Sequence, residues 1–437
     1  AEFLNNVMGL NLSSNDIAAL EARTEGWIAG LQLAALSMHG YQESRQFIES
    51  FTGSHHFVSD YLVQEVINRQ PDHIQDFLLQ TSVLDRMCGS LCDALLQDED
   101  HAAQQILESI QQANLFLVPL DNERHWYRYH HLFGELLRKR LGQVADININ
   151  ELHIRASQWY EENSYDIEAF QHAAAAQDLE RAIRLIEADG TPLYLRGGVD
   201  PVLNWLEGLP LDTMDARPSL WVMYAWILWI THRSLQVEEK LKRAETLLQG
   251  VEPDDRMQDL LGNIAAMRAM LAANEYQTET MIAQSHRALK LLRPDNDYVH
   301  ISVKRTLASA HHIRGNRAEA IRAYKETVAL CEASQNVFTN VLTLTGLGMV
   351  QALETDLIEA DRTFRRVLRL AGSSPKPVAC EAYLGLARIH YEWNDLPKAE
   401  EFGQLAVQMG RQIEGIDTAV AGQVFLAQLA LADGDVH

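Results

Sequence analysis

Cysteine is scarce in this sequence. Its 437 residues include four cysteines, Cys88, Cys92, Cys331 and Cys380. Four cysteines this scattered cannot form the disulfide framework of a small secreted protein, and the Cys88/Cys92 spacing lacks the second pair that a zinc site needs. We therefore expect reduced thiols, most of them in the core.

The sequence also lacks a long apolar run. No stretch approaches the roughly twenty apolar residues that span a bilayer, and the N-terminus has no basic region followed by an apolar one. We predict a cytoplasmic protein without a membrane partner. The chain begins without Met inside what reads as a helix, which indicates a fragment of a longer protein.

Positive charge is in short supply. Lys and Arg number 37 against 60 Asp and Glu, for a formal net charge of -23. Such a surface repels nucleic acid and anionic membranes, so neither is expected as a direct partner. With 47% hydrophobic and 22% charged residues, the composition is that of an ordinary globular protein. The length predicts two to four domains.

Catalytic and phosphate-binding motifs are absent as well. The sequence contains no G-x-x-x-x-G-K-[ST] phosphate loop, no H-E-x-x-H zinc motif and no nucleophile motif. His130, His131, Glu135 and Asp121 could serve acid–base chemistry, but no motif accompanies them. We predict that this chain is not an enzyme, that it has no metal site, and that it holds no cofactor by itself.

The stretch from Asn114 to Leu141 organises the first part of the chain. Leu115 to Leu120 is a short apolar run that ends in turn residues, rings alternate with polar side chains from His125 to Tyr129, and helical spacing then begins at Leu132. This pattern predicts a β-hairpin that leads into a helix. An isolated hairpin must pack on neighbouring helices, as the wing of a winged-helix fold does.

Four helices are expected before the hairpin and complete a winged-helix domain at 51–142. They are Phe57 to Arg69, Asp72 to Leu84 with Pro71 in its first turn, Ser90 to Leu96, and Ala102 to Ala113. Winged helices often bind DNA, but this one is rich in Asp and Glu and poor in Arg before the wing. Phosphate binding needs the opposite sign, so DNA binding is not expected here.

Helical segments flank the winged helix on both sides. Residues 1–50 read as a small helical lid, in which Ser13 to Asp16 cap one helix, Gly26 interrupts, and a second, apolar helix continues from Trp27. Residues 143–215 read as a connector of irregular helical hairpins with glycines at its breaks. No ligand motif is visible in the connector.

Residues 216–437 repeat with a period near forty. The loops before the second helix of each repeat fall at Ser234, Glu275, Gly315, Thr355, Asn394 and Gly434. Five residues after three of these loops come small residues, Ala320, Ala360 and Ala399, and aromatic Tyr324 and Phe364 follow the first two. Small residues at helix crossings and a large one inserted into the next repeat are the tetratricopeptide pattern. We therefore predict an all-α chain, with one small β-hairpin, that ends in a tetratricopeptide-like α-solenoid superhelix.

A solenoid of this kind has a concave surface lined by the first helix of each hairpin. The repeat frame places eight side chains there, namely Trp229, His232, Arg305, Ser309, His312, Glu381, Arg388 and Tyr391. Rings, guanidinium groups and hydrogen-bonding side chains suit a polar organic ligand or a peptide. The alternative is an inner face that is only solvated.

Three segments carry a resemblance to a known family. They are LFLVPLDNERHWYRYHHLFGELLR at the hairpin, TEGWIAGLQLAALS at 24–37 and FLLQTSVLDRMCGSLCDALL at 77–96. Together they resemble the ATP-dependent LuxR-type transcriptional activators related to MalT, of the nucleotide-switch (STAND) class. The resemblance implies a P-loop nucleotide-binding domain, a small helical domain, a winged helix, a helical-repeat sensor and a C-terminal helix-turn-helix, in that order. Because the P-loop and the helix-turn-helix are missing, the chain looks like the middle of such a protein.

The same resemblance implies residues for a nucleotide site. A winged-helix histidine of this class reaches the β-phosphate of bound ADP, and the match falls on His130 rather than His131. Trp27 follows the glycine of a motif that lies beside the adenine base, with Ile28 where the class has proline. The Trp27 indole is either an adenine platform or a core anchor. ADP or ATP is thus expected as the cofactor of the full-length protein.

One predicted function combines these inferences. The chain is read as the sensor and autoinhibitory fragment of a nucleotide-switched transcription activator. ADP holds the winged helix against the nucleotide-binding domain of the same chain, and a small-molecule inducer or a protein in the repeat groove favours the open form. Oligomers are expected only after activation. The alternative is a tetratricopeptide-type scaffold for protein–protein interaction without a small-molecule inducer.

Overall fold

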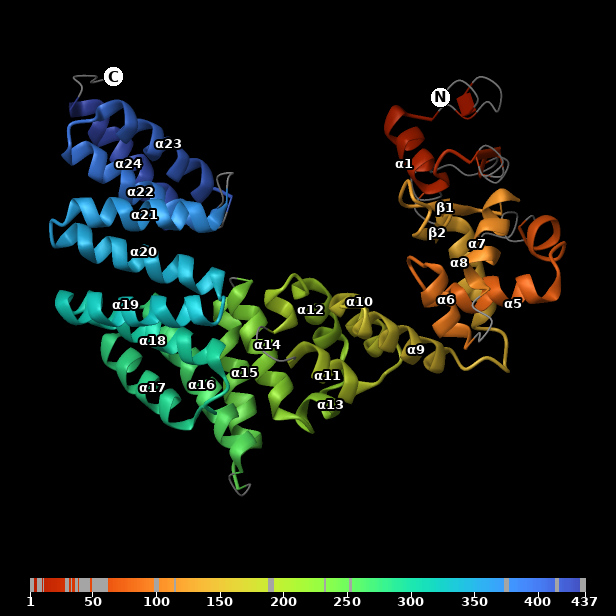
Figure 1. The fold of residues 1–437 in the computed structure, drawn as a ribbon, viewed down its shortest axis with the longest axis horizontal. Helices are drawn as coiled ribbons and strands as arrows, with labels where there is room; N and C mark the ends of the chain where they lie inside the picture. Colours follow the sequence, from red (N-terminus) through yellow and green to blue (C-terminus); the bar gives the residue numbers. More distant parts are fainter. Residues whose placement is uncertain are drawn as a thin grey trace. The chain divides into compact units, whose positions relative to one another are not determined.

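Helices make up nearly all of the regular structure in the part of the chain that the computed structural model describes. That part comprises residues 4–5, 10, 12–27, 31–32, 34–35, 38, 48, 62–97, 102–113, 115–187, 192–231, 233–250, 254–372, 377–412 and 416–432. Its strands form one two-stranded sheet. The chain divides into two units, residues 1–188 with 195–201 and residues 189–194 with 202–437. Figure 1 shows the elements of both units, and the predicted all-α class with one hairpin is confirmed.

The first unit begins with helix α1 (Ser14–Thr24). As predicted, Ser13 caps this helix, and a capping box joins its side chain to Asp16. The helix ends because the next two residues are left-handed, Glu25 with φ 48° and Gly26 with φ 74°. Glycine is the residue that adopts such angles without strain, which explains the break that the sequence indicated.

A winged-helix domain follows. Its elements are η2 (Leu62–Ile67), α5 (Asp72–Thr81), α6 (Gly89–Leu96), α7 (Ala103–Gln112), β1 (Leu117–Pro119), β2 (Tyr127–Tyr129) and α8 (His131–Leu141). Pro71 is the N-cap of α5, one position before the predicted first turn. The predicted first helix here, 57–69, falls partly outside the described residues, and its described part contains the π-helical turn η2.

The predicted β-hairpin is present and is shorter than its apolar run. Strands β1 and β2 are antiparallel and pair Leu117 with Tyr129 and Pro119 with Tyr127. The two tyrosines are buried, and the Tyr129 hydroxyl lies 2.6 Å from the Thr81 hydroxyl of α5. The hairpin is thus fastened to the helices, as an isolated two-stranded ribbon requires.

The connector of the first unit contains α9 (Ile149–Glu162), α10 (Asp166–Ala175) and α11 (Leu179–Glu187). Arg86, in the loop before α6, joins the connector to the wing. Its guanidinium carbon lies 4.6 Å from the Trp126 ring of the wing and 4.9 Å from the Tyr165 ring before α10. Arg86 also forms an ion pair with Glu168 of α10. These cation–π contacts and the ion pair fix the connector to the winged helix.

A pair of histidines lies between α9 and α10. The Nδ1 atoms of His153 and His172 are 2.8 Å apart, so one of the two nitrogens donates a hydrogen bond to the other. The His172 ring also stacks on Tyr160, with centroids 5.4 Å apart. Burial and the neighbouring His153 lower the pKa of His172 to about 3, which keeps its imidazole neutral.

The second unit is the solenoid. It opens with η3 (Leu193–Leu195), α12 (Val199–Gly208) and α13 (Leu211–Asp215) around the boundary between the units. Helical hairpins follow: α14 (Pro218–Ile230) with α15 (Ser234–Leu247), α16 (Asp255–Asn274) with α17 (Thr278–Leu291), α18 (Asp297–Ile313) with α19 (Arg317–Ala333), α20 (Val337–Leu353) with α21 (Leu357–Ala371), and, after η4 (Pro377–Ala379), α22 (Cys380–Glu392) with α23 (Leu396–Gly410). Helix α24 (Ile416–Ala432) comes last.

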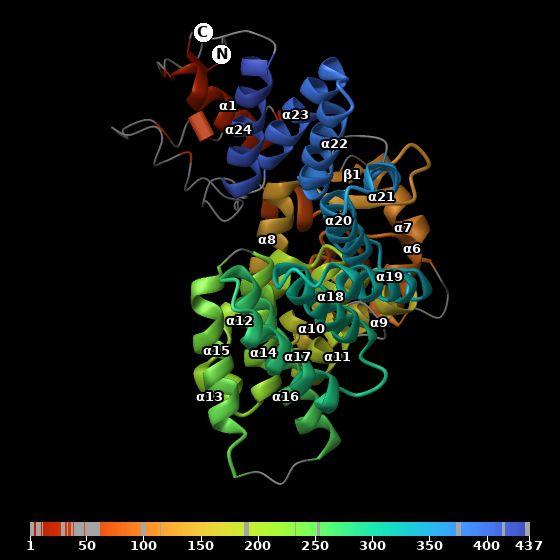
Figure 2. The same cartoon turned by 90° about the vertical axis from the view of Figure 1, so that its left-hand side faces the viewer.

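The first helices of successive hairpins lie next to one another. The row runs through α16, α18, α20, α22 and α24, and each of these helices contacts the next one. Within each hairpin, the first helix also packs on the second helix. Figure 2 gives a second view of these layers. This arrangement is that of a tetratricopeptide-like solenoid, and it supports the prediction that the first helices share one face.

The turns inside the hairpins follow the predicted frame with two displacements. Gly315, Thr355 and Asn394 have left-handed φ angles of 78°, 62° and 58°. In the hairpin of α16 and α17 the left-handed residue is Tyr276, with φ 55°, and not Glu275, so the predicted frame is wrong there by one residue. Ser234 is the first residue of α15 instead of the loop before it, and Gly434 lies outside the described residues.

Small and large residues interlock between repeats as predicted. Ala320, Ala360 and Ala399 are fully buried. The ring of Phe364, on α21, lies against Gly348 of α20 and Gly385 of α22, where an added Cβ would meet the ring at 2.6 Å or less. One aromatic ring thus fills the space that two glycines leave on successive first helices.

Two further observations concern membrane-spanning helices and the cysteines. No described helix combines the length and apolar character that crossing a membrane requires. All four cysteines are buried and have free thiols. Burial raises the pKa of the Cys92 thiol, so this thiol stays protonated and unreactive.

Candidate functional site

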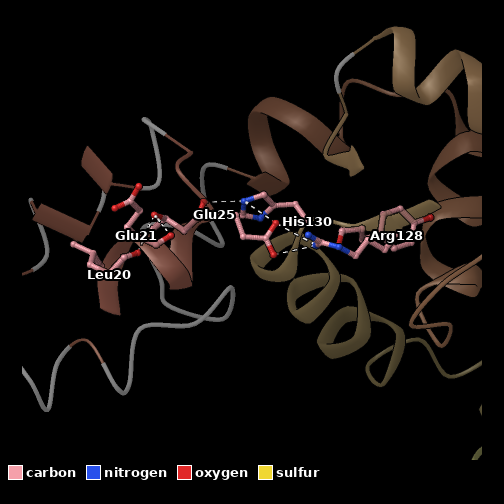
Figure 3. Close-up of polar contacts among 7 residues, drawn as sticks. Leu20, Glu21, Glu25, Arg128 and His130 are labelled. Carbon is pink, nitrogen blue, oxygen red and sulfur yellow. Dashed lines mark hydrogen bonds and ion pairs between the residues drawn. The ribbon is translucent and has the colours of Figure 1, made fainter. Parts of the chain in front are cut away.

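His130 lies where the winged helix contacts the lid helix. It is the N-cap of α8, its side chain is buried, and its Nε2 atom is 2.9 Å from the backbone carbonyl oxygen of Thr24. Thr24 is the last residue of α1, and its own hydroxyl donates to the Leu20 carbonyl at 2.9 Å. The Thr24 carbonyl oxygen belongs to the last turn of α1; it accepts the Trp27 backbone N–H at 2.8 Å, and the His130 ring adds a second hydrogen bond to it. Figure 3 shows this contact.

Glu25 and Arg128 complete the polar cluster around His130. Arg128 Nη1 donates to both carboxylate oxygens of Glu25, at 3.0 and 3.1 Å. The same carboxylate lies 3.8 Å from His130 Nε2. Arg128 also donates to the Tyr129 carbonyl at 3.2 Å, which holds its side chain along β2. In Figure 3 the Glu25 side chain reaches from the lid toward His130 and Arg128 of the wing.

The hydrogen bond to Thr24 determines which nitrogen of His130 carries the proton. A backbone carbonyl only accepts, so Nε2 donates in the neutral ring and Nδ1 is left as an acceptor. Nδ1 is buried and has no hydrogen-bond partner within the described residues. Burial lowers the pKa of His130, while the Thr24 carbonyl and the Glu25 carboxylate oppose that change. His130 is therefore a neutral donor with one unsatisfied nitrogen.

Trp27 packs beside this cluster. Its ring meets Phe116 edge to face at 5.1 Å and His130 at 6.1 Å between centroids. Phe116 has φ 57°, a left-handed angle that is rare and strained for a bulky residue. Phe116 also packs on Phe133 of α8 at 5.3 Å. Trp27 is half-buried among these rings, so packing is the role visible here, and its predicted adenine contact stays a prediction.

Seven of the eight residues predicted for the concave surface lie on first helices. Trp229 on α14 is half-buried and packs edge to face on Trp226 at 6.1 Å. Arg305, Ser309 and His312 lie on α18, where all three are half-buried. Glu381, Arg388 and Tyr391 lie on α22 and are exposed. His232 lies outside the described residues.

Two of these residues line one hollow. Glu381 and Arg388 take part in a cavity of about 190 Å³ together with Met349 of α20, Leu384 and Gly385 of α22, and Thr418 and Ala421 of α24. Tyr391, one turn beyond Arg388, packs edge to face on Phe425 of α24 at 6.1 Å. The structure thus brings together the predicted residues of α22.

The predicted residues of α18 meet different partners. Ser309 hydrogen-bonds the Tyr324 hydroxyl, and Arg305 acts on the same phenol through its charge. Arg305 also acts on the Glu381 carboxyl, where its charge lowers a pKa that burial raises. His312 lies at the end of α18, where burial and Arg317 lower its pKa. Arg305 is thus the residue of α18 that shares an electrostatic environment with α22.

Several residues of both sites were not predicted from the sequence. Glu25 and Arg128 are 103 positions apart in the sequence, so no local sequence pattern predicts their contact. Leu384 could have been found, because it lies on the same helical stripe as Glu381 and Arg388. Thr418 and Met349 come from other repeats, so a frame accurate to one residue would have been needed.

Comparison with protein families identifies two regions of this chain. Residues 63–146 match the family model of the MalT winged helix domain, and residues 262–437 match that of the MalT-like TPR region. The first match covers the hairpin and His130, and the second covers α18, α22 and the hollow. The predicted winged helix and tetratricopeptide-like region are therefore confirmed.

Two relatives of known name align with nearly the whole of this chain. The serine/threonine-protein kinase PknK of Mycobacterium tuberculosis is 29% identical over 443 residues, which cover 100% of this chain and 39% of that protein. The HTH-type transcriptional regulator MalT of Yersinia pestis is 26% identical over 433 residues, which cover 97% of this chain and 47% of that protein. The chain thus spans less than half the length of either relative.

A solved structure shows a similar fold. It is that of a Signal Transduction ATPase with Numerous Domains (STAND) protein with a tetratricopeptide repeat sensor from Pyrococcus horikoshii. The TM-score is 0.62 at 15% sequence identity, and the match covers 92% of this chain and 62% of that chain. At this identity the likeness concerns the fold.

Proposed function

We propose that this chain, whose winged helix and TPR region match the MalT models, is the sensing and autoinhibitory middle of a nucleotide-switched transcription activator. The winged helix holds the resting state, and the solenoid receives the signal. The full-length protein carries ADP or ATP in a nucleotide-binding domain outside this chain and acts in the cytoplasm. Oligomers form only in the activated state.

The buried His130 carries this proposal. Its ring joins the winged helix to the end of the lid, and its Nδ1 atom lacks a partner in the described part of the chain. An unsatisfied buried nitrogen costs about 1–3 kcal/mol, so the site gains free energy when a donor or a proton reaches it. A histidine at a domain contact with unused hydrogen-bonding capacity is suited to a contact that forms and breaks.

In the proposed resting state, His130 carries a proton on Nδ1 as well and donates a hydrogen bond from it to the β-phosphate of ADP. A charge-assisted hydrogen bond contributes about 1.5–3 kcal/mol, which corresponds to about a ten- to hundredfold change in the ratio of open to closed protein. Because that bond exists only when the domains are closed, its loss shifts the equilibrium without altering the fold. Inducer in the solenoid shifts the same equilibrium in the open direction.

Substitution of His130 in the full-length protein tests this mechanism. His130→Ala should raise transcription in the absence of inducer and weaken ADP retention. His131→Ala is the matched control, because His131 is exposed and lies 3.4 Å from Glu135 on its own helix. Basal transcription and ADP retention that both stay unchanged in His130→Ala would show that the histidine is structural.

The chain itself is proposed to have no catalytic activity. Its two matched regions are a winged helix and a repeat region, and no described group of three or more His, Cys, Asp or Glu side chains could hold a metal ion. The relative PknK is named a kinase, but this chain covers 39% of it. Catalysis in such a relative is therefore expected from its remaining length.

A protein-interaction scaffold is the second candidate function. Exposed apolar side chains recur where hairpins turn, among them Leu235, Tyr276, Ile358 and Trp393, which are 98%, 72%, 61% and 44% exposed. Such side chains suit a protein partner at the edge of the solenoid. Titration calorimetry with small metabolites distinguishes the two functions, because a pure scaffold shows no binding heat with any of them.

A further inference from the structure

Two charged side chains of opposite sign face the hollow beside α22. Glu381 and Arg388 are exposed, and neither forms an ion pair or hydrogen bond with another described residue. Most arginines of the second unit do form ion pairs, as Arg268 does with Glu238 at 3.0 Å and with Glu245 at 2.9 Å. The hollow therefore presents a free carboxylate and a free guanidinium group.

The spacing of these charges sets a length. Glu381 and Arg388 are seven residues apart, which places them on one face of α22 with about 10 Å between their positions along the helix axis. They cannot pair directly as residues four apart do. A ligand that contacts both must carry two charges several ångströms apart.

The other residues that line the hollow are mostly aliphatic. Met349, Leu384, Gly385 and Ala421 line the hollow, and Thr418 adds a residue with a hydroxyl group. None of the lining residues is aromatic, so the hollow lacks the ring on which a sugar stacks. Its volume of about 190 Å³ is below the roughly 300–1,000 Å³ of drug-sized pockets, so its ligand is small.

The electrostatic surroundings favour a cation next to Glu381. This side chain is open to solvent on one side, but the surrounding helices remove enough water to raise the pKa of its carboxyl, and Arg305 of α18 only partly opposes that rise. An ammonium group beside the carboxylate would compensate its lost hydration. Arg388 offers the paired donors that a carboxylate accepts.

We propose that this hollow binds a small zwitterion of dipeptide length, with its carboxylate on Arg388 and its ammonium group on Glu381. An extended dipeptide is roughly 7 Å long, and a charge-assisted hydrogen bond at each end brings the span to about 12 Å, which is comparable with the separation of the two charged positions. The inference rests on the proposed sensor function, and it names the chemical class of the ligand.

Calorimetric titration of the 437-residue chain with L-alanyl-L-alanine tests the site. We expect binding of the free dipeptide and none of N-acetyl-alanyl-alanine amide, which lacks both charges, or of maltose. Arg388→Gln and Glu381→Gln should each weaken binding by about tenfold or more. Arg369→Gln is the matched control, because it removes an exposed arginine of α21 that does not line the hollow. It should leave the affinity unchanged.

Exchanging the two charges gives a sharper test. A chain with both Glu381→Arg and Arg388→Glu should bind the dipeptide in the reverse orientation, so binding lost in the single variants should return. Binding of the blocked peptide equal to that of the free one would overturn the proposal. So would the absence of dipeptide binding at millimolar concentration, or unchanged affinity in the single variants.

These outcomes are independent of the switch mechanism. If the dipeptide binds but does not raise transcription by the full-length protein, the site stands and the proposed sensing function fails. If the dipeptide does not bind while His130→Ala still raises basal transcription, the site fails and the switch stands.

Discussion

Mild acid should destabilise the first unit through His172. This imidazole has a pKa of about 3 in the folded protein, because it is buried and faces His153. In the unfolded chain a histidine titrates near 6.5. Below about pH 6.5 the unfolded state therefore binds a proton that the folded state does not, and the free energy of unfolding falls as the pH falls. The loss stops only near pH 3, where the folded state binds the proton as well.

The size of the effect follows from the two pKa values. Each pH unit below 6.5 removes about 1.4 kcal/mol, so pH 5.0 should cost about 2 kcal/mol relative to pH 7.5. The hydrogen bond between the two rings also predicts a loss of stability in acid, because the 2.8 Å contact between Nδ1 of His153 and Nδ1 of His172 needs one unprotonated nitrogen. If both rings were charged, both nitrogens would carry hydrogens and the bond would be lost.

His172→Gln isolates this contribution. All other titrating groups are shared, so the change in unfolding free energy between pH 7.5 and 5.0 should be about 2 kcal/mol smaller in the variant than in the parent. Hydrogen-exchange protection of peptides from α9 and α10, measured across a urea series at both pH values, reports it locally. Parallel pH dependence in parent and variant would refute the assignment of a neutral, buried His172.

Three further outcomes follow from contacts described above. Gly348→Ala should lower the free energy of unfolding by about 1–3 kcal/mol in urea denaturation, because the added Cβ would lie 2.6 Å from the Phe364 ring. Gly208→Ala is the control and should not destabilise the chain, because an added Cβ there would have nothing within 4 Å. Equal effects of the two substitutions would contradict the packing argument. Arg86→Met should cost about 1–2 kcal/mol and alter the fluorescence of Trp126; no change in either would show that the cation–π contacts are energetically unimportant. The chain should not hydrolyse ATP, and turnover above a heat-killed control would contradict that expectation.

Local patterns were enough for the parts of the fold that depend on neighbours in sequence. The change from alternating rings to helical spacing near Leu132 predicted the hairpin and α8, because the two periods differ. The repeat frame was correct at Gly315, Thr355 and Asn394, and of these residues glycine and asparagine adopt left-handed angles readily. It was displaced at Tyr276, since tyrosine gives no signal of such a turn.

The sites depended on contacts that no local pattern encodes. The stripe on α22 predicted Glu381 and Arg388, but the hollow needs side chains from α20 and α24 whose register is set by packing. His130 was inferred from a family resemblance, while its actual partner, the Thr24 carbonyl, is 106 residues away. Contacts between residues this far apart in the sequence are set by the tertiary fold, so they could not be predicted from local sequence patterns.

The ring of Phe364 also constrains how this repeat array can change over generations. It lies against Gly348 and Gly385, so three positions on three helices share one volume. A side chain added at either glycine is tolerated only after the ring becomes smaller, and a smaller ring leaves a void until a glycine is replaced. In an alignment of related repeats, these three positions should therefore vary together, and single changes at any one of them should be rare.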